Sequence, residues 1–278
     1  MKTEHLFQHE AMKTTFSLRL LESNAQLVRD AALAAIAQID AIENSLSRYI
    51  EGSDVSQINH MKTGESLFVS ETCYECLLLS LEASEQSGGL FDVTIGKRIE
   101  HLKNNQAGSN PPLEGKLQID PDRPAIHCIQ AGREIDLGGI GKGFALDQIQ
   151  TLLKDWNIPS ALLSAGASTQ LAYGEKVWPI TLEHAGKRSH IELQNTALSA
   201  SGTEIQGSHI LSPRDESATY TYPRIWALNK SAAFADAYST AALLMNADEL
   251  RSLKDHTQII TPEDLQPSAR PPNSEHSA

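Results

Sequence analysis

The stretch of this 278-residue sequence with the clearest chemical potential is IDLGGIGKGFALDQI, at residues 135–149. It contains three glycines at alternating positions: Gly139, Gly141 and Gly143. Glycine lets a backbone approach another group closely, and free N–H groups at a helix start favour a bound anion. Lys142 could add a positive charge, and Asp136 could accept hydrogen bonds from the N–H or O–H groups of a ligand. The segment therefore predicts a site for an anionic ligand.

Neither common nucleotide-binding motif fits this segment. A P-loop requires the pattern G-x-x-x-x-G-K-[ST], but a glycine follows Lys142, and the position five before Gly141 is Asp136. The pattern G-x-G-x-x-G also fails, because the sixth residue of the run that starts at Gly139 is Phe144. A tight turn with close packing remains an alternative reason for the glycines.

A second candidate is FADAYSTAALLM, at residues 234–245, where Asp236 and Thr240 stand four residues apart. On a helix this spacing puts both side chains on one face. A carboxylate and a hydroxyl suit a hard cation such as magnesium, although backbone carbonyls, waters or phosphates must complete its six positions. The alternative is an aspartate favoured by the dipole at a helix start, with Thr240 on a polar face.

A third candidate is His209, within SGTEIQGSHILSP at residues 201–213. A histidine can act as a general base near neutral pH. A purely structural histidine is the alternative.

Cys73 and Cys76 form a C-x-x-C pair, which could indicate redox chemistry or zinc binding. Zinc would require a second pair of ligands, and no such cluster follows in the sequence. We therefore expect two partly buried cysteines on a helix that is capped by Ser70 or Thr72.

The periodicity of apolar residues predicts the scaffold for these candidates. Alternation indicates a strand at residues 14–21, and spacings of three and four indicate a helix at residues 24–47. Further helices are expected at residues 70–86, 140–155 and 232–246. The intervening residues 47–60 should form a loop, and the polar residues 103–124 should form a surface excursion.

Short strands dominate the middle of the chain. Residues 125–130 and 133–137 should form a hairpin that turns at Ala131-Gly132. Further strands are expected near residues 160–164, 168–173, 177–182, 189–193, 197–201 and 207–211. Their close spacing favours antiparallel pairing, so we predict an α+β fold of mostly antiparallel sheets packed with helices. This unit should occupy residues 1–264, and the proline-rich residues 265–278 should form a disordered tail.

Composition limits the possible functions. Hydrophobic residues make up 40% of the chain, which is enough for a core, and the formal net charge is −12. This charge argues against broad binding to nucleic acid or anionic lipid, but not against one phosphorylated ligand. No signal-peptide pattern, lipid-attachment cysteine or apolar run of about 18 residues occurs. We therefore expect a cytoplasmic protein with no membrane insertion, or a periplasmic one if the chain is a trimmed mature form.

Six segments in order resemble the ApbE-type FAD:protein FMN transferase family, from about residue 10 to about residue 260. They are the opening Ala11-Met12-Lys13-Thr14, a loop from Arg48-Tyr49 to Asn59, the turn at residues 89–96, residues 136–147, Ser201-Gly202 followed by His209-Ile210-Leu211-Ser212-Pro213, and the helix that contains residues 235–241. One such match would be weak, whereas six in the right order are specific.

The resemblance implies an ApbE-like flavin transferase architecture and a magnesium-dependent reaction. Members of this family use FAD as a substrate. A Thr or Ser hydroxyl of a target protein attacks the phosphorus on the FMN side, and AMP leaves. The expected partner of this chain is therefore an acceptor protein with a flavinylated Thr or Ser, such as an electron-transfer subunit.

The resemblance also implies roles for individual residues. Mg²⁺ would be held by Asp236, Thr240 and the backbone carbonyl of Gly139, and His209 would be the base for the incoming hydroxyl. The residues expected to bind FAD are Met12, Tyr49, Leu90, Phe91, Asp92, Asp136, Lys142 and Leu211.

The sequence departs from the family pattern near the expected acceptor site rather than near the metal site. Lys13 replaces a glycine, Ala167-Ser168 replaces Gly-Asp, and Ser212 replaces an aspartate. Two alternatives therefore stay open: a metal-dependent FAD pyrophosphatase, in which water replaces the protein hydroxyl, and a non-catalytic FAD-binding protein.

Overall fold

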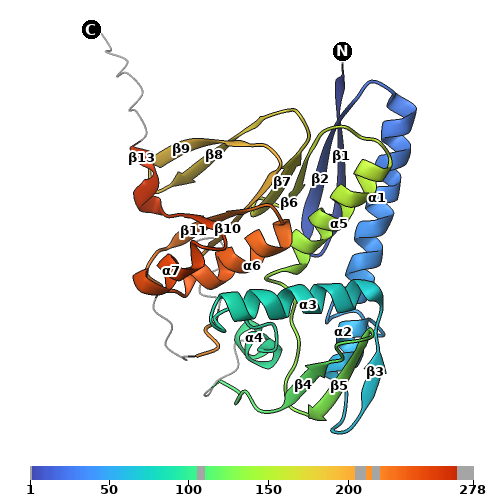
Figure 1. Cartoon of the computed structure of the whole chain (residues 1–278), viewed down its shortest axis with the longest axis vertical. Helices are drawn as coiled ribbons and strands as arrows, with labels where there is room; N and C mark the ends of the chain where they lie inside the picture. The colour runs from blue at the N-terminus through green and yellow to red at the C-terminus, as the bar shows by residue number, and fades with distance from the viewer. Residues whose placement is uncertain (1, 105–109, 204–210, 215–219, 268–278) are drawn as a thin grey trace.

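A seven-stranded antiparallel sheet forms the centre of the computed structural model, which describes residues 2–104, 110–203, 211–214 and 220–267 (Figure 1). Its strands lie in the order β1 (Thr3–Ala11), β2 (Thr14–Glu22), β6 (Ala161–Ala165), β7 (Thr169–Tyr173), β10 (Thr196–Gly202), β11 (Arg224–Asn229) and β12 (Gln258–Ile260). All neighbouring pairs are antiparallel. The predicted α+β class with antiparallel sheets is therefore confirmed.

Two three-stranded sheets complete the β-structure. One contains β8 (Trp178–His184), β9 (Lys187–Leu193) and β13 (Gln266–Pro267), and the other contains β3 (Ser66–Phe68), β4 (Lys116–Ile119) and β5 (Ala125–Gln130). Alternate residues of the large sheet point to opposite faces. Leu162 and Trp226 share an apolar cluster with Trp178 of β8, whereas Leu163 belongs to the main core. The β8–β9 sheet therefore covers the face that the helices leave open.

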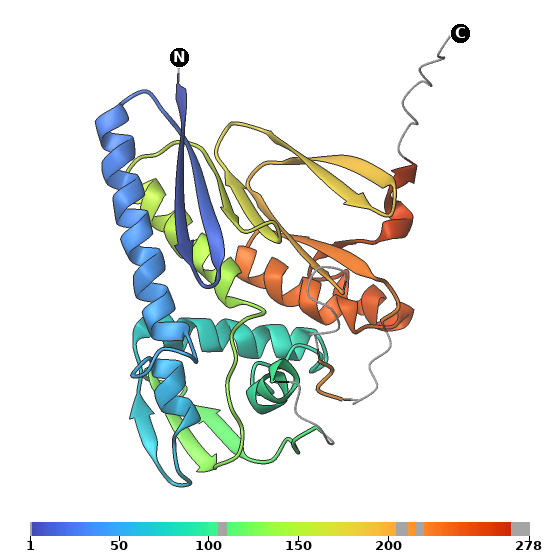
Figure 2. The ribbon, with the colours of Figure 1, turned by 180° about the vertical axis from the view of Figure 1, so that it is seen from behind.

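Helices cover the other face of the large sheet. Those that contact its strands are α1 (Ala25–Leu46), α5 (Gly141–Asp155) and α6 (Ala232–Leu243). The remaining helices are α2 (Asp54–Asn59), α3 (Glu71–Gln86), α4 (Gly96–Lys103), α7 (Ala247–Leu253) and the 3-10 turn η1 (Pro262–Asp264). Figures 1 and 2 show α3 running across the lower ends of α1 and α5, between the large sheet and the β3–β5–β4 sheet. None of these helices within the described residues has the length and apolarity needed to cross a bilayer.

The innermost helix is α6, which contacts β10, β11 and α5. Ten of its twelve residues are buried, and six of those ten are alanines. Small side chains let backbones approach closely, so the alanines of α6 let it fit between the sheet and α5. Asp236 is buried on this helix, so its position is fixed by the core of the protein.

The long helices and most strands lie where the sequence predicts them, but two loops contain more structure than expected. The predicted loop at residues 47–60 contains α2, which begins at its N-cap Ser53, whose side chain accepts a hydrogen bond from Ser56 N. The predicted excursion at residues 103–124 contains β4. Both elements are short, with six and four residues, so they carry little periodic signal.

The hairpin predicted for residues 125–130 and 133–137 is wrong. Strand β5 pairs with β3 and β4 instead. The chain after β5 turns away, and Glu134 forms a parallel bridge with Ile95. The alternation of apolar and polar residues identified extended segments, but it could not show which strands pair with one another.

Several elements of the fold were not anticipated: β1, α4, β11, α7 and β12. Of the strand expected near residues 207–211, only Leu211 lies within the described residues, and there it belongs to no strand. At the other end, Leu265 is buried and β13 pairs with β9, so packing continues past the boundary expected at residue 264. Residues 268–278 lie outside the described part of the chain.

The cysteine pair is structural. Cys73 and Cys76 are fully buried on α3, whose N-cap is Ser70. Burial raises the pKa of Cys73 to about 12 and that of Cys76 well above its usual value. Both thiols therefore stay protonated at neutral pH, which removes the nucleophilic form that redox chemistry requires.

Candidate active site

The glycine-rich segment is held by two motif residues from elsewhere in the chain. The Asn59 side chain binds both backbone groups of Ile135, at 2.9 Å to the carbonyl oxygen and 2.6 Å to the N–H. The Asp136 N–H donates to the carbonyl of Val93, at 2.8 Å. The loop that ends at Asn59 and the turn before residue 96 therefore position the start of the site.

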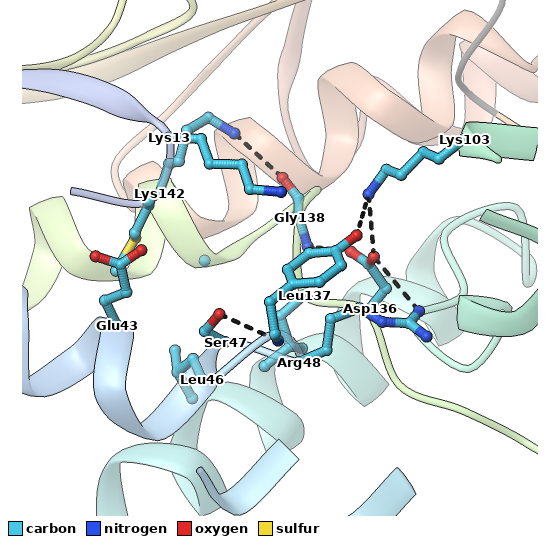
Figure 3. Close-up of a pocket in the computed structure, with 13 residues that line it drawn as sticks. Lys13, Glu43, Leu46, Ser47, Arg48, Lys103, Asp136, Leu137, Gly138 and Lys142 are labelled. Carbon is cyan, nitrogen blue, oxygen red and sulfur yellow. Dashed lines mark hydrogen bonds and ion pairs between the residues drawn. The ribbon is translucent and has the colours of Figure 1, made fainter. Parts of the chain in front are cut away.

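The carboxylate of Asp136 has a hydrogen-bond donor on only one of its two oxygens among the described residues. Its Oδ1 accepts a hydrogen bond from Gly138 N at 2.8 Å. Its Oδ2 is buried and accepts no hydrogen bond from any described residue, although Arg48 Nη1 and Lys103 Nζ each lie 3.6 Å away (Figure 3). A buried carboxylate oxygen without a hydrogen-bond donor is costly. This oxygen is therefore suited to accept a hydrogen bond from a ligand.

A cavity of about 190 Å³ lies beside Asp136. It is lined by Met12, Lys13, Glu43, Leu46, Ser47, Arg48, Tyr49, Lys103, Asp136, Leu137, Gly138, Gly141 and Lys142. Four of these side chains are cationic and two are carboxylates, so the lining is locally positive in a chain of net charge −12. This charge distribution favours an anionic ligand.

Close packing requires glycine at position 143 and leaves little room for a side chain at position 139. A Cβ at Gly143 would lie 2.1 Å from the carbonyl oxygen of Ala232, so the starts of α5 and α6 touch through their backbones. A Cβ at Gly139 would lie 3.1 Å from Phe91 Cε2 and 3.4 Å from Thr240 Oγ1. Gly141 differs, because its Cβ position has room and it lines the cavity. The packing explanation and the ligand explanation therefore apply to different glycines of one segment.

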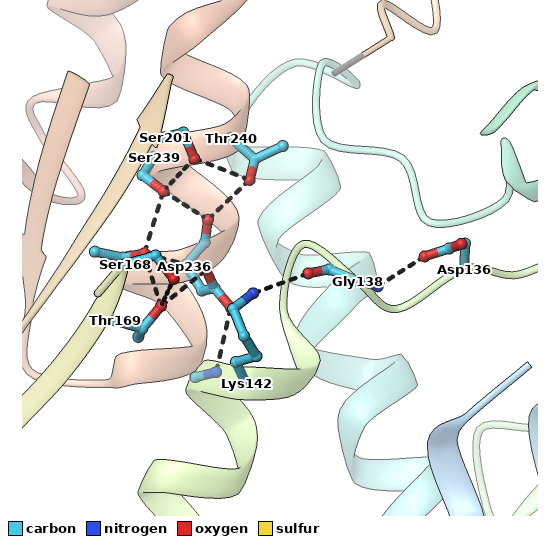
Figure 4. Close-up of polar contacts among 11 residues, drawn as sticks. Asp136, Gly138, Lys142, Ser168, Thr169, Ser201, Asp236, Ser239 and Thr240 are labelled. Carbon is cyan, nitrogen blue, oxygen red and sulfur yellow. Dashed lines mark hydrogen bonds and ion pairs between the residues drawn. The ribbon is translucent and has the colours of Figure 1, made fainter. Parts of the chain in front are cut away.

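Asp236 lies at the centre of a group of hydrogen-bond donors (Figure 4). Its Oδ1 accepts from Thr169 Oγ1 at 3.2 Å and Ser199 Oγ at 3.1 Å. Its Oδ2 accepts from Gly143 N at 3.2 Å and Lys142 Nζ at 3.3 Å. No acidic residue lies in the first turn of α6, so the helix-start explanation for Asp236 is wrong.

The three residues expected to hold magnesium lie together. Thr240 Oγ1 donates to the carbonyl of Asp236 at 3.1 Å, and the Thr240 side chain lies next to Gly139, where an added Cβ would be 3.4 Å from Thr240 Oγ1. The described residues contain no group of three or more His, Cys, Asp or Glu side chains placed to hold a metal. A magnesium site here would therefore combine one carboxylate with neutral oxygen donors.

This donor set fits a hard cation. Lys142 Nζ already lies within 3.3 Å of Asp236 Oδ2 and 3.1 Å of the Gly138 carbonyl oxygen, so a positive charge occupies the point where these oxygens converge. Thr169 and Ser199 are neutral donors that orient the carboxylate without cancelling its charge. Phosphate or water oxygens would have to supply the remaining ligands.

The other residues predicted to bind FAD occupy different positions. Met12 and Tyr49 line the cavity with Asp136 and Lys142. Leu90 and Phe91 are buried in the main core, each with 4% of its surface exposed, and Phe91 lies next to Gly139.

Asp92 is engaged in a turn rather than in the cavity lining. Its Oδ1 accepts from the N–H and hydroxyl of Thr94, both at 2.7 Å, and its Oδ2 from Arg133 at 3.3 Å. Leu211 is half-buried, three residues before Arg214, which donates to the Gly88 carbonyl and pairs with Glu249. His209 lies outside the described residues.

Asp147 is a site-building residue to which the sequence analysis gave no role. It ends the motif at residues 136–147, and it caps α6 from α5. Its carboxylate accepts from Ser231 Oγ at 2.6 Å, Ala232 N at 2.8 Å and Ala233 N at 2.9 Å. Burial raises the pKa of Asp147, although these three donors act in the opposite direction. Asp147 lies four residues after Gly143, so the two residues share a face of the helix. This spacing could have indicated that Asp147 contacts the same neighbouring element as Gly143.

We expect Asp147→Ala to destabilise the fold by about 1–3 kcal/mol, because it leaves the N–H groups of Ala232 and Ala233 in the first turn of α6 without an acceptor. Urea unfolding measures the loss. Asp155→Ala is a matched control, since Asp155 is exposed at the end of the same helix. Equal stability of the two variants would contradict the capping role.

The family and the fold of the chain follow from comparison with known proteins. The ApbE family matches residues 12–261. FAD:protein FMN transferases from Klebsiella pneumoniae and Chlamydia muridarum are 23% and 24% identical over 257 and 272 residues. These alignments cover 78% and 85% of this chain, and 71% and 83% of those proteins.

Two solved structures have the same fold. The apo flavinyl transferase ApbE from Pseudomonas stutzeri superimposes with a TM-score of 0.79 at 21% identity, covering 93% of this chain and 90% of that one. The ApbE protein from Thermotoga maritima gives 0.79 at 22% identity, with 93% and 94% covered. The family match spans most of the chain and includes both the glycine segment and the helix that build the site. This chain therefore belongs to the ApbE family.

Proposed function

We propose that this protein is a magnesium-dependent FAD:protein FMN transferase, which attaches FMN to a Thr or Ser hydroxyl of an acceptor flavoprotein and releases AMP. One observation carries the proposal. Asp236 and Thr240 lie one helical turn apart, with Thr240 next to Gly139, and the neighbouring cavity is positively charged and contains the unused carboxylate oxygen of Asp136. A dinucleotide with a pyrophosphate and polar rings can use both features. The names of the relatives support the same reaction.

The residues of the cavity divide the task of holding FAD. The cations would pair with the pyrophosphate, and Asp136 Oδ2 would accept a hydrogen bond from a ring or sugar. The half-exposed Tyr49 ring offers an aromatic face for stacking. Magnesium, held by Asp236, Thr240 and the Gly139 carbonyl, would neutralise charge on the phosphate oxygens.

The transfer itself breaks the pyrophosphate bridge. The acceptor hydroxyl forms a new P–O bond at the FMN phosphorus, and AMP leaves with the electron pair of the broken P–O bond. We assign the hydroxyl proton to His209, which follows from the family resemblance. Lys142 lies beside Asp236 and would stabilise charge on the departing phosphate.

The alternatives differ in the group that attacks phosphorus. In an FAD pyrophosphatase water takes the place of the acceptor hydroxyl, and in a binding protein no bond breaks. The test incubates the purified protein with FAD and Mg²⁺, with and without an acceptor flavoprotein domain. We expect the acceptor to gain the mass of FMN, with one AMP released per transfer. Acceptor-independent AMP release would indicate the hydrolase, and FAD binding without AMP would indicate the binding protein.

We expect Asp236→Asn to abolish turnover and to lower Mg²⁺ affinity by roughly a hundredfold or more, because an amide lacks the charge that a cation requires. Asparagine keeps an oxygen for Thr169 and Ser199, whereas Asp236→Ala would leave buried donors unpaired. Calorimetric titration with Mg²⁺ measures the affinity. Asp248→Ala is the control, since Asp248 is exposed on α7. Wild-type metal dependence in Asp236→Asn would rule out this metal site.

We expect His209→Ala to slow transfer by roughly 10²–10⁴-fold while leaving FAD affinity nearly unchanged, as the loss of a general base would do. Fluorescence titration gives the affinity, and single-turnover labelling of the acceptor gives the rate. His256→Ala serves as the control, because His256 is exposed after α7. Equal losses of affinity and rate would make His209 a ligand contact instead.

A further inference from the structure

Lys13 has an unusual backbone conformation. Ala11 pairs with Thr14, so Met12 and Lys13 form the two-residue turn between β1 and β2. Their φ angles are +50° and +58°, in the left-handed region that favours glycine. Two-residue hairpins with such angles usually contain asparagine, aspartate or glycine. A lysine here is disfavoured locally, and residues in sparsely populated conformations cluster at functional sites.

The side chain of Lys13 reaches across the mouth of the cavity. Its Nζ lies 4.0 Å from the centre of the Tyr49 ring. Lys103 Nζ lies 5.3 Å from the same centre and donates to the Tyr49 hydroxyl at 2.7 Å, and Arg48 lies 5.8 Å away. Three cations therefore surround one aromatic ring that is 49% exposed.

Lys13 differs from the other cations of the cavity in its partners. Arg48 and Lys103 each lie 3.6 Å from Asp136, and Lys142 lies 3.3 Å from Asp236. Within the described residues, Lys13 instead forms no ion pair, and its ammonium lies over the face of Tyr49. Its charge is therefore available for an anionic ligand.

Resting on the proposed function, we propose that Lys13 is an affinity-determining residue that binds a phosphate of FAD and uncovers the Tyr49 ring as it does so. A cation–π contact at an exposed ring is weak, whereas an ammonium–phosphate pair is a charge-assisted hydrogen bond. A phosphate that enters the cavity should thus draw Nζ away from the ring. The freed face can then stack on a ring of the ligand.

The experiment separates the charge of Lys13 from its backbone. FAD affinity is measured by fluorescence titration in phosphate-free buffer for the wild type, Lys13→Met, Lys13→Arg and Lys13→Gly. Lys116→Met is the matched control, since Lys116 is exposed on β4 away from the cavity. We expect Lys13→Met and Lys13→Gly to weaken FAD binding by roughly three- to tenfold at low salt, with a smaller difference at high salt because of screening.

Two further comparisons make the test specific. Lys13→Arg should keep near wild-type affinity, because it keeps the charge. Lys13→Gly should raise the melting temperature even as it weakens binding, because glycine accepts the left-handed turn. Wild-type affinity in Lys13→Met, or equal losses in Lys13→Met and Lys13→Arg, would overturn this inference but not the proposed function, which the transferase assay of the wild-type protein tests. A wild-type protein that fails to bind FAD would overturn the proposed function as well.

Discussion

The site depends on one backbone contact, between the first turn of α5 and the first turn of α6. The Ala232 carbonyl occupies the place where any residue other than glycine at position 143 would have a side chain. This approach brings Gly143 N within hydrogen-bond distance of Asp236, and it lets Asp147 cap α6. A single methyl group at this position would separate the two helices and misplace both the carboxylate and its donors.

Electrostatics then set the character of the site. Neutral hydroxyls and a backbone N–H fix the direction of the Asp236 carboxylate, and Lys142 is its one cationic partner among the described residues. Asp136, by contrast, faces two cations without a hydrogen bond to Oδ2. The pKa of Lys103 reflects this environment: burial opposes its charge, but Tyr49 and Asp136 outweigh burial and raise the pKa. The protein thus concentrates positive charge at one place on an otherwise acidic chain.

Sequence reasoning identified what local sterics and spacing determine. The glycines at the start of α5 and the pair Asp236 and Thr240 could be found in the sequence. Close backbone approach selects glycine, and helical periodicity sets a spacing of four residues. Partnerships between distant segments left no such pattern, so the pairing of β5 and the capping of α6 by Asp147 were missed. The same is true of Asp92. Its position in the motif does not reveal that its carboxylate oxygens accept hydrogen bonds from Thr94 and Arg133. Its contact with FAD, like the role of His209, stays a prediction.

The distribution of the site along the chain has a consequence for biosynthesis. Lys142 and Asp236 interact across 94 positions, and the cavity wall begins at Met12 in the first hairpin. A nascent chain that has emerged from the ribosome only as far as α5 contains the cationic residues of the cavity. It still lacks α6 and the carboxylate of Asp236. Such an intermediate cannot assemble the complete pocket. The site that we propose for FAD can therefore be complete only after α6 has been translated and packed against α5.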